Sequence, residues 1–395
     1  MRPRGPAILL SAVEPSADAM GAALVPALRA RLPGVRLVGC GGPQMAAAGF
    51  EGAFDTRRLA VMGLGDALRA VPEAARRARQ LARLAADARA DAAVLIDGWG
   101  FSRLVATRTA RASPGTALVK LAAPQVWASR PGRAAFVRAH FSLVLTLLPF
   151  EPLLFEGPRT RAAFVGNPNF EAAARAPRDG GAFRARHGLG DAPVLAVLPG
   201  SRAGEVRRLA PVLGETAARV AEAVPRLRVV VPAAPAVEAM VREAAARWAP
   251  APLVVPGPER FDAFAAASAA VAASGTVTTE LAICGVPTVV GYRTDALTAA
   301  WARRVLVTPH VSVVNVAAGA AVMPEHLQED CTPERLGADA ARLLTDEAAR
   351  RRQLDAFGRV VPTLLGEGDA AARAADEVAR LLGQREHPGD LNAGA

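Results

Sequence analysis

The chain has 395 residues, of which 51% are hydrophobic and 21% are charged, and its formal net charge at pH 7 is +10. This length suggests two or three domains, and so apolar a composition excludes an intrinsically disordered chain. Almost all of the positive charge is arginine, because Lys120 is the only lysine, and the excess favours anionic partners such as phosphates or acidic lipids. No nucleic-acid-binding motif accompanies the charge, so we expect no nucleic-acid partner.

Short apolar segments alternate with helical tracts along the first part of the chain, which is typical of a parallel α/β sheet. Strands are predicted at 7–12, 35–39, 92–96, 118–121 and 143–147, with a helix over 18–31. A second such series follows, with strands predicted at 194–198, 227–231, 253–255, 269–273 and 288–290. The pattern predicts two doubly wound, Rossmann-like domains facing across a cleft.

Proline and glycine interrupt the pattern at 166–168 and 172–181, which are the best candidates for a linker. We therefore expect an N-terminal domain at 1–168 and a C-terminal domain at 169–359. The remaining segment, 360–395, is expected to hold a C-terminal helix able to pack back on the first domain, followed by a frayed tail from about Glu386.

The cysteines and histidines show no spacing typical of a metal site or a disulfide framework. The three cysteines are widely separated, and the five histidines form no metal-binding pattern, so we expect no metal, no cofactor and a reducing compartment. No run approaches the roughly 20 apolar residues of a membrane span, and Glu14 ends the apolar run near the amino terminus. The sequence predicts a soluble or peripheral protein.

The strongest local signal follows the predicted strand at 194–198, where Gly200, Ser201 and Arg202 lead into a helix. Glycine allows a tight turn, and the free N–H groups of a helix N-terminus bind anions. Arg202 adds a charge-assisted donor for the same phosphate. The loop lacks the Gly-Lys-Ser/Thr of a Walker A motif, and a mere tight turn remains an equal alternative.

A second junction of this kind follows the predicted strand at 269–273. Ser274, Gly275 and Thr276 offer hydroxyls and backbone N–H groups to a diphosphate, and Glu280 lies one helical turn after Thr276. A carboxylate there suits ribose hydroxyls, although a capped helix with an exposed glutamate is the plainer interpretation. Two such junctions in one domain make a nucleotide more probable than either alone.

In the first domain, two segments with acidic side chains follow predicted strands, where open α/β sheets bind ligands. Glu14 and Ser16 follow the first strand, and Asp97 follows the strand at 92–96. Asp97 is a candidate general base, and a helix-capping role is about equally compatible with its spacing. A basic tract at 67–89 predicts either a solvated helix face or a helix attracted to anionic lipid.

From about residue 8 to 382, the chain resembles the lipid-A-disaccharide synthases, inverting glycosyltransferases of the GT-B fold. The motifs that carry the resemblance, in order, are Glu14-Pro15-Ser16-Ala17-Asp18, Gly41-Gly42-Pro43 with Met45, Val61-Met62-Gly63-Leu64, Ile96-Asp97, Gln125-Val126-Trp127-Ala128, Leu147-Leu148-Pro149-Phe150-Glu151, 198–206, 274–280, Gly285-Val286-Pro287, Gly291-Tyr292-Arg293, Val311-Ser312 with Asn315, and Leu327-Gln328-Glu329.

The resemblance implies transfer of 2,3-diacylglucosamine from its UDP donor to 2,3-diacylglucosamine 1-phosphate, with inversion, forming a β-1,6-linked disaccharide and UDP. It implies Asp97 as the base, Arg202 at the donor phosphate, Glu280 at the ribose, and Asn315 and Gln328 near the donor. It also implies a cytoplasmic enzyme peripheral to the anionic inner membrane, with no catalytic metal and with a homo-oligomer left open.

The chain departs from the family pattern after Asp97, where Trp99-Gly100-Phe101-Ser102 replaces a Pro-Asp-Phe-Asn sequence. Asp97 is then the only carboxylate left beside that motif. Two alternatives stay open: a related GT-B enzyme such as a UDP-GlcNAc 2-epimerase-like protein, and a non-catalytic paralogue that binds lipid or nucleotide.

Overall fold

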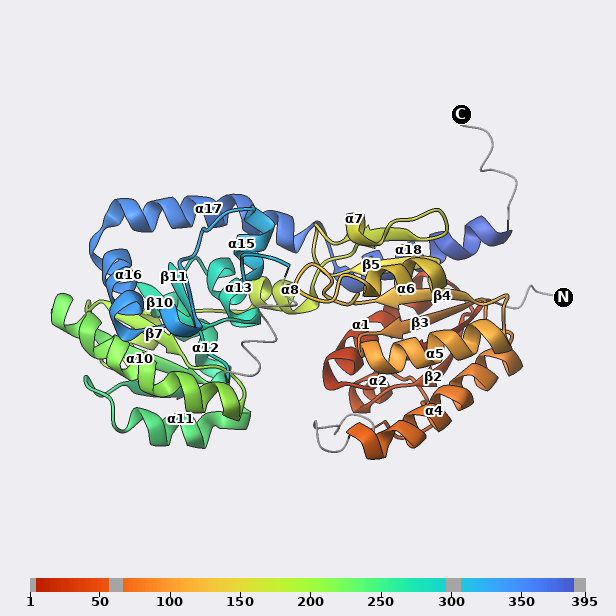
Figure 1. Ribbon diagram of the computed structural model, residues 1–395, viewed down its shortest axis with the longest axis horizontal. Coiled ribbons are helices and arrows are strands. Elements are labelled where there is room, and N and C mark those ends of the chain that lie inside the picture. Colours follow the sequence, from red (N-terminus) through yellow and green to blue (C-terminus); the bar gives the residue numbers. More distant parts are fainter. Residues whose placement is uncertain (1–4, 57–66, 296–306, 387–395) are drawn as a thin grey trace. The chain divides into compact units, whose positions relative to one another are not determined.

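The computed structural model describes residues 5–56, 67–295 and 307–386, and the chain divides into two compact units. One unit comprises Met1–Pro168 with Gly366–Ala395, and the other comprises Asn169–Leu365. Each unit holds one parallel sheet between two layers of helices (Figure 1). The chain passes from the first unit to the second and returns, so its last described helix belongs to the unit of its first strand.

In the first unit, the described residues form a six-stranded parallel sheet in the order β2-β1-β3-β4-β5-β6. The strands are β1 (Ala7–Ser11), β2 (Arg36–Cys40), β3 (Ala92–Ile96), β4 (Ala117–Leu121), β5 (Leu143–Thr146) and β6 (Arg161–Phe164). After β1 the chain adds β2 on one side and β3 on the other. Such a reversal opens a crevice at the carboxyl ends of the two central strands, here β1 and β3.

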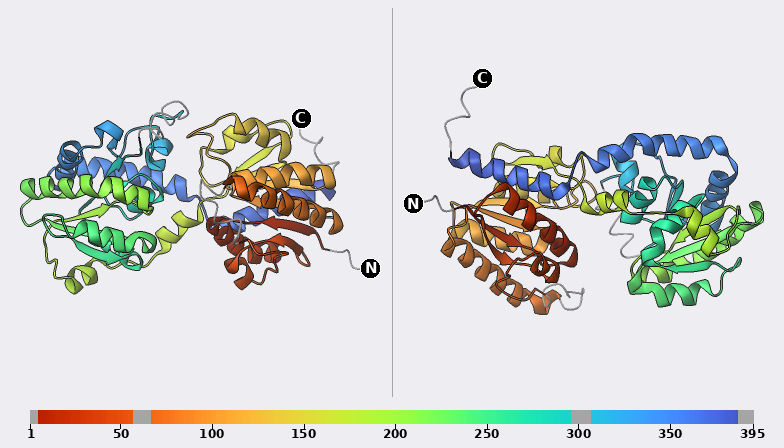
Figure 2. Two further views of the ribbon diagram at one scale, coloured as in Figure 1. Left: turned by 60° about the horizontal axis from the view of Figure 1, so that its bottom comes forward. Right: turned by 180° about the vertical axis from the view of Figure 1, so that it is seen from behind.

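Helices cover both faces of this sheet because its strands are apolar on both sides. They are α1 (Pro15–Arg31), α2 (Pro43–Ala47), α4 (Ala67–Asp87), α5 (Trp99–Ala112), α6 (Arg133–His140), α7 (Pro152–Phe155) and α18 (Ala370–Glu386). Ile8 and Leu10 of β1 pack in a cluster with α1 and α18, whereas Leu9 packs on the other face with α4 and α5. Figure 2 shows α18 lying along the same unit as α1.

In the second unit, the described residues form another six-stranded parallel sheet, in the order β12-β11-β10-β7-β8-β9. The strands are β7 (Val194–Leu198), β8 (Arg228–Ala233), β9 (Leu253–Pro256), β10 (Ala269–Ala273), β11 (Thr288–Tyr292) and β12 (Glu325–Leu327). The chain order reverses between β7 and β10, so the crevice of this unit lies at their carboxyl ends.

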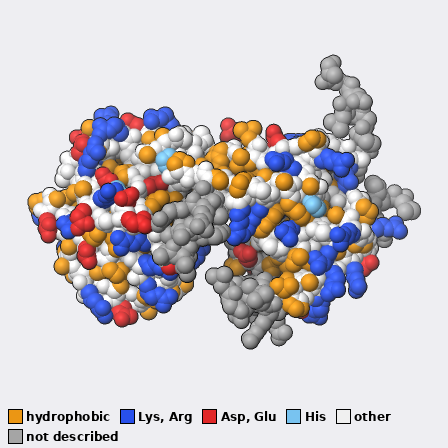
Figure 3. Space-filling model, in the orientation of Figure 1, with side chains coloured by type: hydrophobic (Ala, Val, Ile, Leu, Met, Phe, Trp, Pro, Cys, Tyr) orange, Lys and Arg blue, Asp and Glu red, His pale blue; other side chains and the backbone are white. Residues whose placement is uncertain are grey.

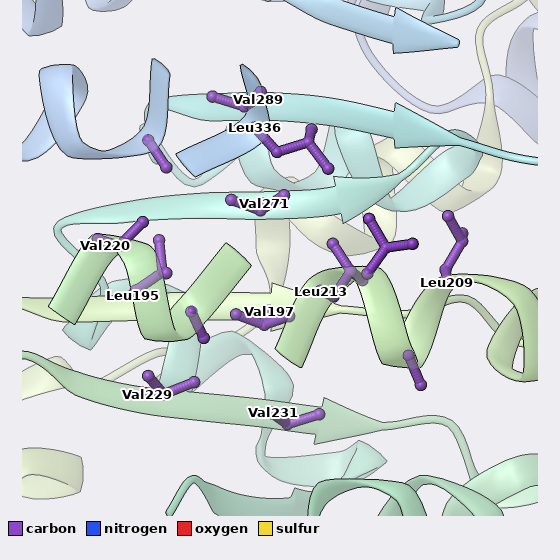
Figure 4. Close-up of a cluster of buried hydrophobic side chains, with 14 of the residues drawn as sticks. Leu195, Val197, Leu209, Leu213, Val220, Val229, Val231, Val271, Val289 and Leu336 are labelled. Carbon is purple, nitrogen blue, oxygen red and sulfur yellow. The ribbon is translucent and has the colours of Figure 1, made fainter. Parts of the chain in front are cut away.

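The helices of the second unit again form two layers. They are α8 (Pro168–Arg175), α9 (Gly180–Arg186), α10 (Ala203–Ala223), α11 (Glu238–Ala245), α12 (Arg260–Ala266), α13 (Thr276–Ile283), α15 (Val313–Ala318), α16 (Pro333–Thr345) and α17 (Glu347–Leu365). Figure 4 shows one core cluster, in which Leu209 and Leu213 of α10 and Leu336 of α16 pack on Val197 of β7 and Val271 of β10. This packing fixes the first turn of α10 above the end of β7.

The predicted fold class is confirmed, and every predicted strand is present with its ends within two residues. Two strands were not predicted, β6 and β12, which are edge strands of only four and three residues. The expected linker at 172–181 is partly wrong because α8 runs through Arg175 from Pro168, a residue well suited to the first turn of a helix. The motif at 61–64 and the tail beyond Glu386 lie outside the described residues.

None of the described helices is both long and apolar enough to cross a membrane.

Candidate active site

The second unit contains a cavity of about 500 Å³ at the carboxyl ends of β7 and β10. A cavity of this size is typical of small-ligand sites. Many of the residues predicted to bind the donor line it, from both strand-to-helix junctions. They are Gly200, Ser201, Arg202, Ser274, Gly275, Thr276 and Glu280.

The first turn of α10 forms one wall of this cavity. Gly200 has a φ of +110°, and a Cβ there would lie 2.6 Å from the Cβ of Glu205, so glycine is required. Glu205 Oε2 accepts the backbone N–H groups of Ser201 at 3.0 Å and Arg202 at 3.3 Å. The expectation that these donors are free for an anion is therefore wrong, because a carboxylate of the same helix satisfies them.

The Arg202 guanidinium lies at the cavity and is 81% exposed. Its Nη1 donates to Oε1 of Glu205 at 3.0 Å. An exposed ion pair between side chains three residues apart contributes only about 0.2–0.5 kcal/mol, so the guanidinium can exchange this partner for a phosphate at little cost. Arg202 and the Glu205 carboxylate thus form a small polar cluster that a bound anion would rearrange.

The first turn of α13 forms a second wall. Ser274 donates its hydroxyl to the carbonyl of Val311 at 3.2 Å, and Thr278 donates to the carbonyl of Gly275 at 2.8 Å. The donors in both bonds are side-chain hydroxyls, so these bonds do not use the backbone N–H groups of the first turn. Those N–H groups have no acceptor within the helix. Together with the positive end of the helix dipole, they make this wall suited to a phosphate.

Glu280, one turn further along α13, forms an ion pair with Arg260. Arg260 Nε lies 3.4 Å from Oε2 of Glu280, and its guanidinium stacks 4.2 Å from the ring centre of Phe261. The Glu280 side chain is 14% exposed and lines the cavity. Ionised carboxylate oxygens only accept hydrogen bonds, which suits them to ribose hydroxyls. Sequence reasoning missed Arg260, and no local pattern marks it.

Asn315 and Gln328, which were predicted near the donor, do not line the cavity. The Asn315 amide is fully buried, donates to the carbonyl of Met323 and accepts its N–H, both at 2.8 Å. Gln328 Oε1 accepts the N–H of Thr294 at 3.2 Å. Both amides bind backbone, so in this structure they fix neighbouring loops.

The predicted residues of the first unit meet at the carboxyl ends of β1 and β3. Asp97 has a φ of +48°, and its Oδ2 accepts the hydroxyl of Ser16 at 2.9 Å. A Cβ built on Gly98 would lie 3.4 Å from Oε1 of Glu14, so this second carboxylate is close by. Burial raises the pKa of Glu14, and the Asp97 charge raises it further. The capping alternative for Asp97 is wrong, because no side chain caps α5.

Lys120 of β4 is 1% exposed and interacts electrostatically with both carboxylates. Its ammonium donates to the carbonyls of Asp97 at 2.7 Å, Leu121 at 3.0 Å and Leu95 at 3.2 Å. Burial lowers the pKa of Lys120 to about 7, against the opposing effects of Asp97 and Glu14. Sequence reasoning counted this lysine only as charge, although its position inside an apolar strand was a usable signal.

Two further acidic residues join motifs that lie far apart in the sequence. Asp18 is buried and accepts the N–H groups of Gly42, Gln44 and Met45 at 2.8–3.0 Å, which fixes the start of α2. Glu151 accepts the indole N–H of Trp127 at 3.1 Å and two backbone N–H groups after β5. These carboxylates hold the loops at the ligand-binding edge of the sheet.

The described residues include no cluster of three or more histidine, cysteine or acidic side chains that could hold a metal ion.

Solved structures with this architecture are glycosyltransferases and related nucleotide-sugar enzymes. The MurG structure from Acinetobacter baumannii has a TM-score of 0.56 at 14% identity, covering 96% of this chain and 99% of its own. The calicheamicin glycosyltransferase CalG4 has a TM-score of 0.53 at 20% identity, covering 97% and 99%. A putative UDP-N-acetylglucosamine 2-epimerase from Listeria monocytogenes has a TM-score of 0.60 at 14% identity, covering 98% and 97%. The chain therefore has the GT-B fold.

The family is shown by sequence. A family model described as lipid-A-disaccharide synthetase matches residues 8–370. The lipid-A-disaccharide synthase of Rhodospirillum centenum is 42% identical over 383 residues, covering 96% of this chain and 95% of that protein. The enzyme of the same name from Paramagnetospirillum magneticum is 43% identical, covering 95% and 98%. This chain belongs to the lipid-A-disaccharide synthase family, whose members are glycosyltransferases acting on sugar-nucleotide and lipid-linked substrates. This chain therefore shares only its fold with the 2-epimerases, and the epimerase alternative is wrong.

Proposed function

We propose that the cavity of the second unit binds the UDP part of the donor and that Asp97 of the first unit is the catalytic base. The donor is UDP-2,3-diacylglucosamine and the acceptor is 2,3-diacylglucosamine 1-phosphate. The observation that carries this proposal is the convergence of the N-terminus of α13, an exposed Arg202 and the Glu280 carboxylate on one cavity. Glu14 and Ser16 accompany Asp97 in binding the acceptor.

In the transfer step, the 6-hydroxyl oxygen of the acceptor attacks C1 of the donor sugar while the bond from C1 to the diphosphate breaks. The attack comes from the face opposite the diphosphate, so the configuration at C1 inverts. Asp97 accepts the hydroxyl proton, and UDP leaves with the bond electrons. Negative charge grows on the diphosphate, where Arg202 and the N-terminus of α13 stabilise it.

Two contacts orient the carboxylate of Asp97 for this role. The Ser16 hydroxyl binds one of its oxygens, and the Asp97 N–H donates to the carbonyl of Leu121 at 2.9 Å, which anchors the residue to β4. General base catalysis typically contributes about 10²–10⁴-fold, so Asp97→Asn is expected to lower kcat by that factor. Asparagine keeps the size of the side chain, so folding and UDP binding are expected to survive.

The test measures transfer from labelled donor at saturating concentrations of both substrates, with a thermal melt and UDP titration calorimetry on the same samples. Asp91→Asn is the matched control, because Asp91 lies at the opposite end of β3 and its Oδ2 accepts the Ala7 N–H at 2.8 Å. Near-normal turnover in a folded Asp97→Asn enzyme would show that Asp97 is not the base.

We further propose that the first unit contacts the anionic inner membrane through an arginine face on α4. Arg76, Arg79 and Arg83 are exposed on this helix, and Figure 3 shows basic side chains over α4 and α5. The apolar face of α4 is already used, since Leu81 and Ala85 pack on the sheet. Insertion of an amphipathic helix needs a free apolar face, so the contact expected here is electrostatic.

A further inference from the structure

The transfer mechanism above does not use the buried ammonium of Lys120 in the first unit. An ammonium has three N–H donors, and all three are directed to carbonyls, those of Leu95, Asp97 and Leu121. Burying a charge is costly unless it is fully hydrogen-bonded and paired. The three carbonyl acceptors offset part of this cost. We infer that the buried charge of Lys120 has a specific role.

The ammonium of Lys120 binds the backbone of Asp97. The residue is held in the left-handed region, with a φ of +48°, and Gly98 follows with a φ of +49°. Only a few per cent of residues other than glycine adopt such a conformation, and they keep it only where contacts enforce it. The Asp97 carbonyl accepts from Lys120 at 2.7 Å and from the Ser102 hydroxyl at 2.6 Å, which locks the peptide that aims the carboxylate.

We propose that Lys120 is a positioning residue for the transfer reaction, whose ammonium fixes the backbone of Asp97 and offsets the charges of Asp97 and Glu14. The inference rests on Asp97 being the base. The charged groups facing Lys120 are these two carboxylates, one from the end of β3 and one from the end of β1. Lys120 does not touch the reacting atoms and acts through Asp97.

A pH dependence follows from the charge of Lys120. A neutral amine has two N–H donors and a lone pair, so one of the three carbonyls loses its bond and faces the lone pair. The two carboxylates also lose their nearest positive charge. Because burial lowers the pKa of Lys120 to about 7, this change falls near neutral pH. Transfer is expected to slow as the pH rises through that value.

The experiment uses the fact that Lys120 is the only lysine of the chain. Full-length protein labelled with ¹³Cε-lysine gives a single side-chain resonance, whose chemical shift reports the protonation of this residue directly. We expect a midpoint near 7 that coincides with the basic limb of the kcat profile. Asp97→Asn is expected to lower the midpoint, because it removes a favourable charge. A resonance that shows no midpoint below pH 9 would overturn the proposal without any variant having to fold.

Lys120→Gln tests the positioning role in the active enzyme. The glutamine amide keeps two donors but no charge, and a displaced base typically costs on the order of 10²-fold in rate. We therefore expect kcat to fall by about 10- to 100-fold, with the basic limb near pH 7 abolished and UDP affinity unchanged. Lys120→Arg keeps a charge at every pH, and it is expected to recover activity and also to lack that limb.

Thr116→Val is the matched control, because Thr116 is buried just before β4 and donates to the carbonyl of Ala90 at 2.8 Å, at the opposite end of the sheet. It is expected to lower the melting temperature while leaving the pH profile unchanged. A folded Lys120→Gln enzyme with the wild-type rate and profile would refute the positioning role. If Asp97→Asn abolishes transfer in that case, the proposed base still stands; if Asp97→Asn retains transfer, the base itself fails.

Discussion

Replacing Arg202 with alanine separates binding of the donor from stability of the fold. In the free protein the guanidinium is 81% exposed, and its Nη1 donates to Oε1 of Glu205 at 3.0 Å. Losing such a pair changes the free energy of unfolding by less than about 0.5 kcal/mol, which corresponds to a change in Tm of less than about 2 °C for a unit of this size. The variant is therefore expected to be folded.

Binding of UDP is expected to respond much more strongly. A hydrogen bond from a charged donor to a phosphate contributes about 1.5–3 kcal/mol, from which up to about 0.5 kcal/mol is subtracted because the exposed contact with Glu205 is given up. The net loss of about 1–3 kcal/mol weakens UDP binding by roughly 5- to 160-fold. Because charge on the diphosphate grows during transfer, kcat is expected to fall as well.

The assay is calorimetric titration of UDP into wild type, Arg202→Ala and Arg207→Ala, with transfer rates measured on the same samples. Arg207 lies on the same helix and is exposed, but it does not line the cavity, so its removal controls for the loss of one positive charge. If Arg202→Ala and Arg207→Ala both bind UDP as wild type does, the diphosphate does not contact Arg202.

Three further expectations concern the rest of the chain. Binding to vesicles that contain anionic lipid should fall as salt rises, because screening shortens the range of the exposed α4 arginines, and equal sedimentation with neutral and anionic vesicles at every salt concentration would argue against an electrostatic contact. Asp18→Ala should lower the free energy of unfolding by about 3 kcal/mol in denaturant titrations, because three N–H groups lose a buried charged acceptor, and a loss below about 1 kcal/mol would contradict that account. Burial raises the pKa of Glu151 to about 7 despite its N–H donors, so the native state binds this proton more tightly than the unfolded chain does. The resulting stability is fully present below pH 4.5 and is lost as the pH rises through 7. Unfolding measured at pH 5 and pH 8 should show this loss in wild type and not in Glu151→Gln, and equal losses in both would assign the effect to other groups.

Sequence periodicity predicted the central strands because a buried parallel strand is a short, continuous apolar run, as at Ala92–Ile96. It missed β6 and β12, because strands of four and three residues are too short to show a distinct apolar run. The glycines and hydroxyls after β7 and β10 were found because anion-binding turns need particular residue types in order. Glu205 escaped notice as an internal acceptor, because a capping glutamate and a ligand-binding glutamate have the same spacing.

Asn315 and Lys120 illustrate the limit of reasoning from motifs. A motif position identifies a residue but not the direction of its side chain, and the Asn315 amide is directed at Met323. Lys120 is a charged residue within an apolar strand, which the sequence shows but no motif marks. Its acceptors come from the ends of two different strands. Only the three-dimensional pairing of β3 with β4 brings those carbonyls together.

The return of the chain to its first unit affects the order in which the protein is completed during synthesis. Ala374, Ala375 and Val378 of α18 are buried in the same cluster as Leu24 and Leu28 of α1. The ribosome makes α18 only after the whole of the second unit, so the first sheet to leave it waits longest for its covering helix. Until then the apolar surface that α18 covers is exposed, and a fragment ending at Pro168 would keep it exposed permanently. We therefore expect such a fragment to aggregate, and chaperones that bind nascent chains to find their main target in the half of the protein that is made first.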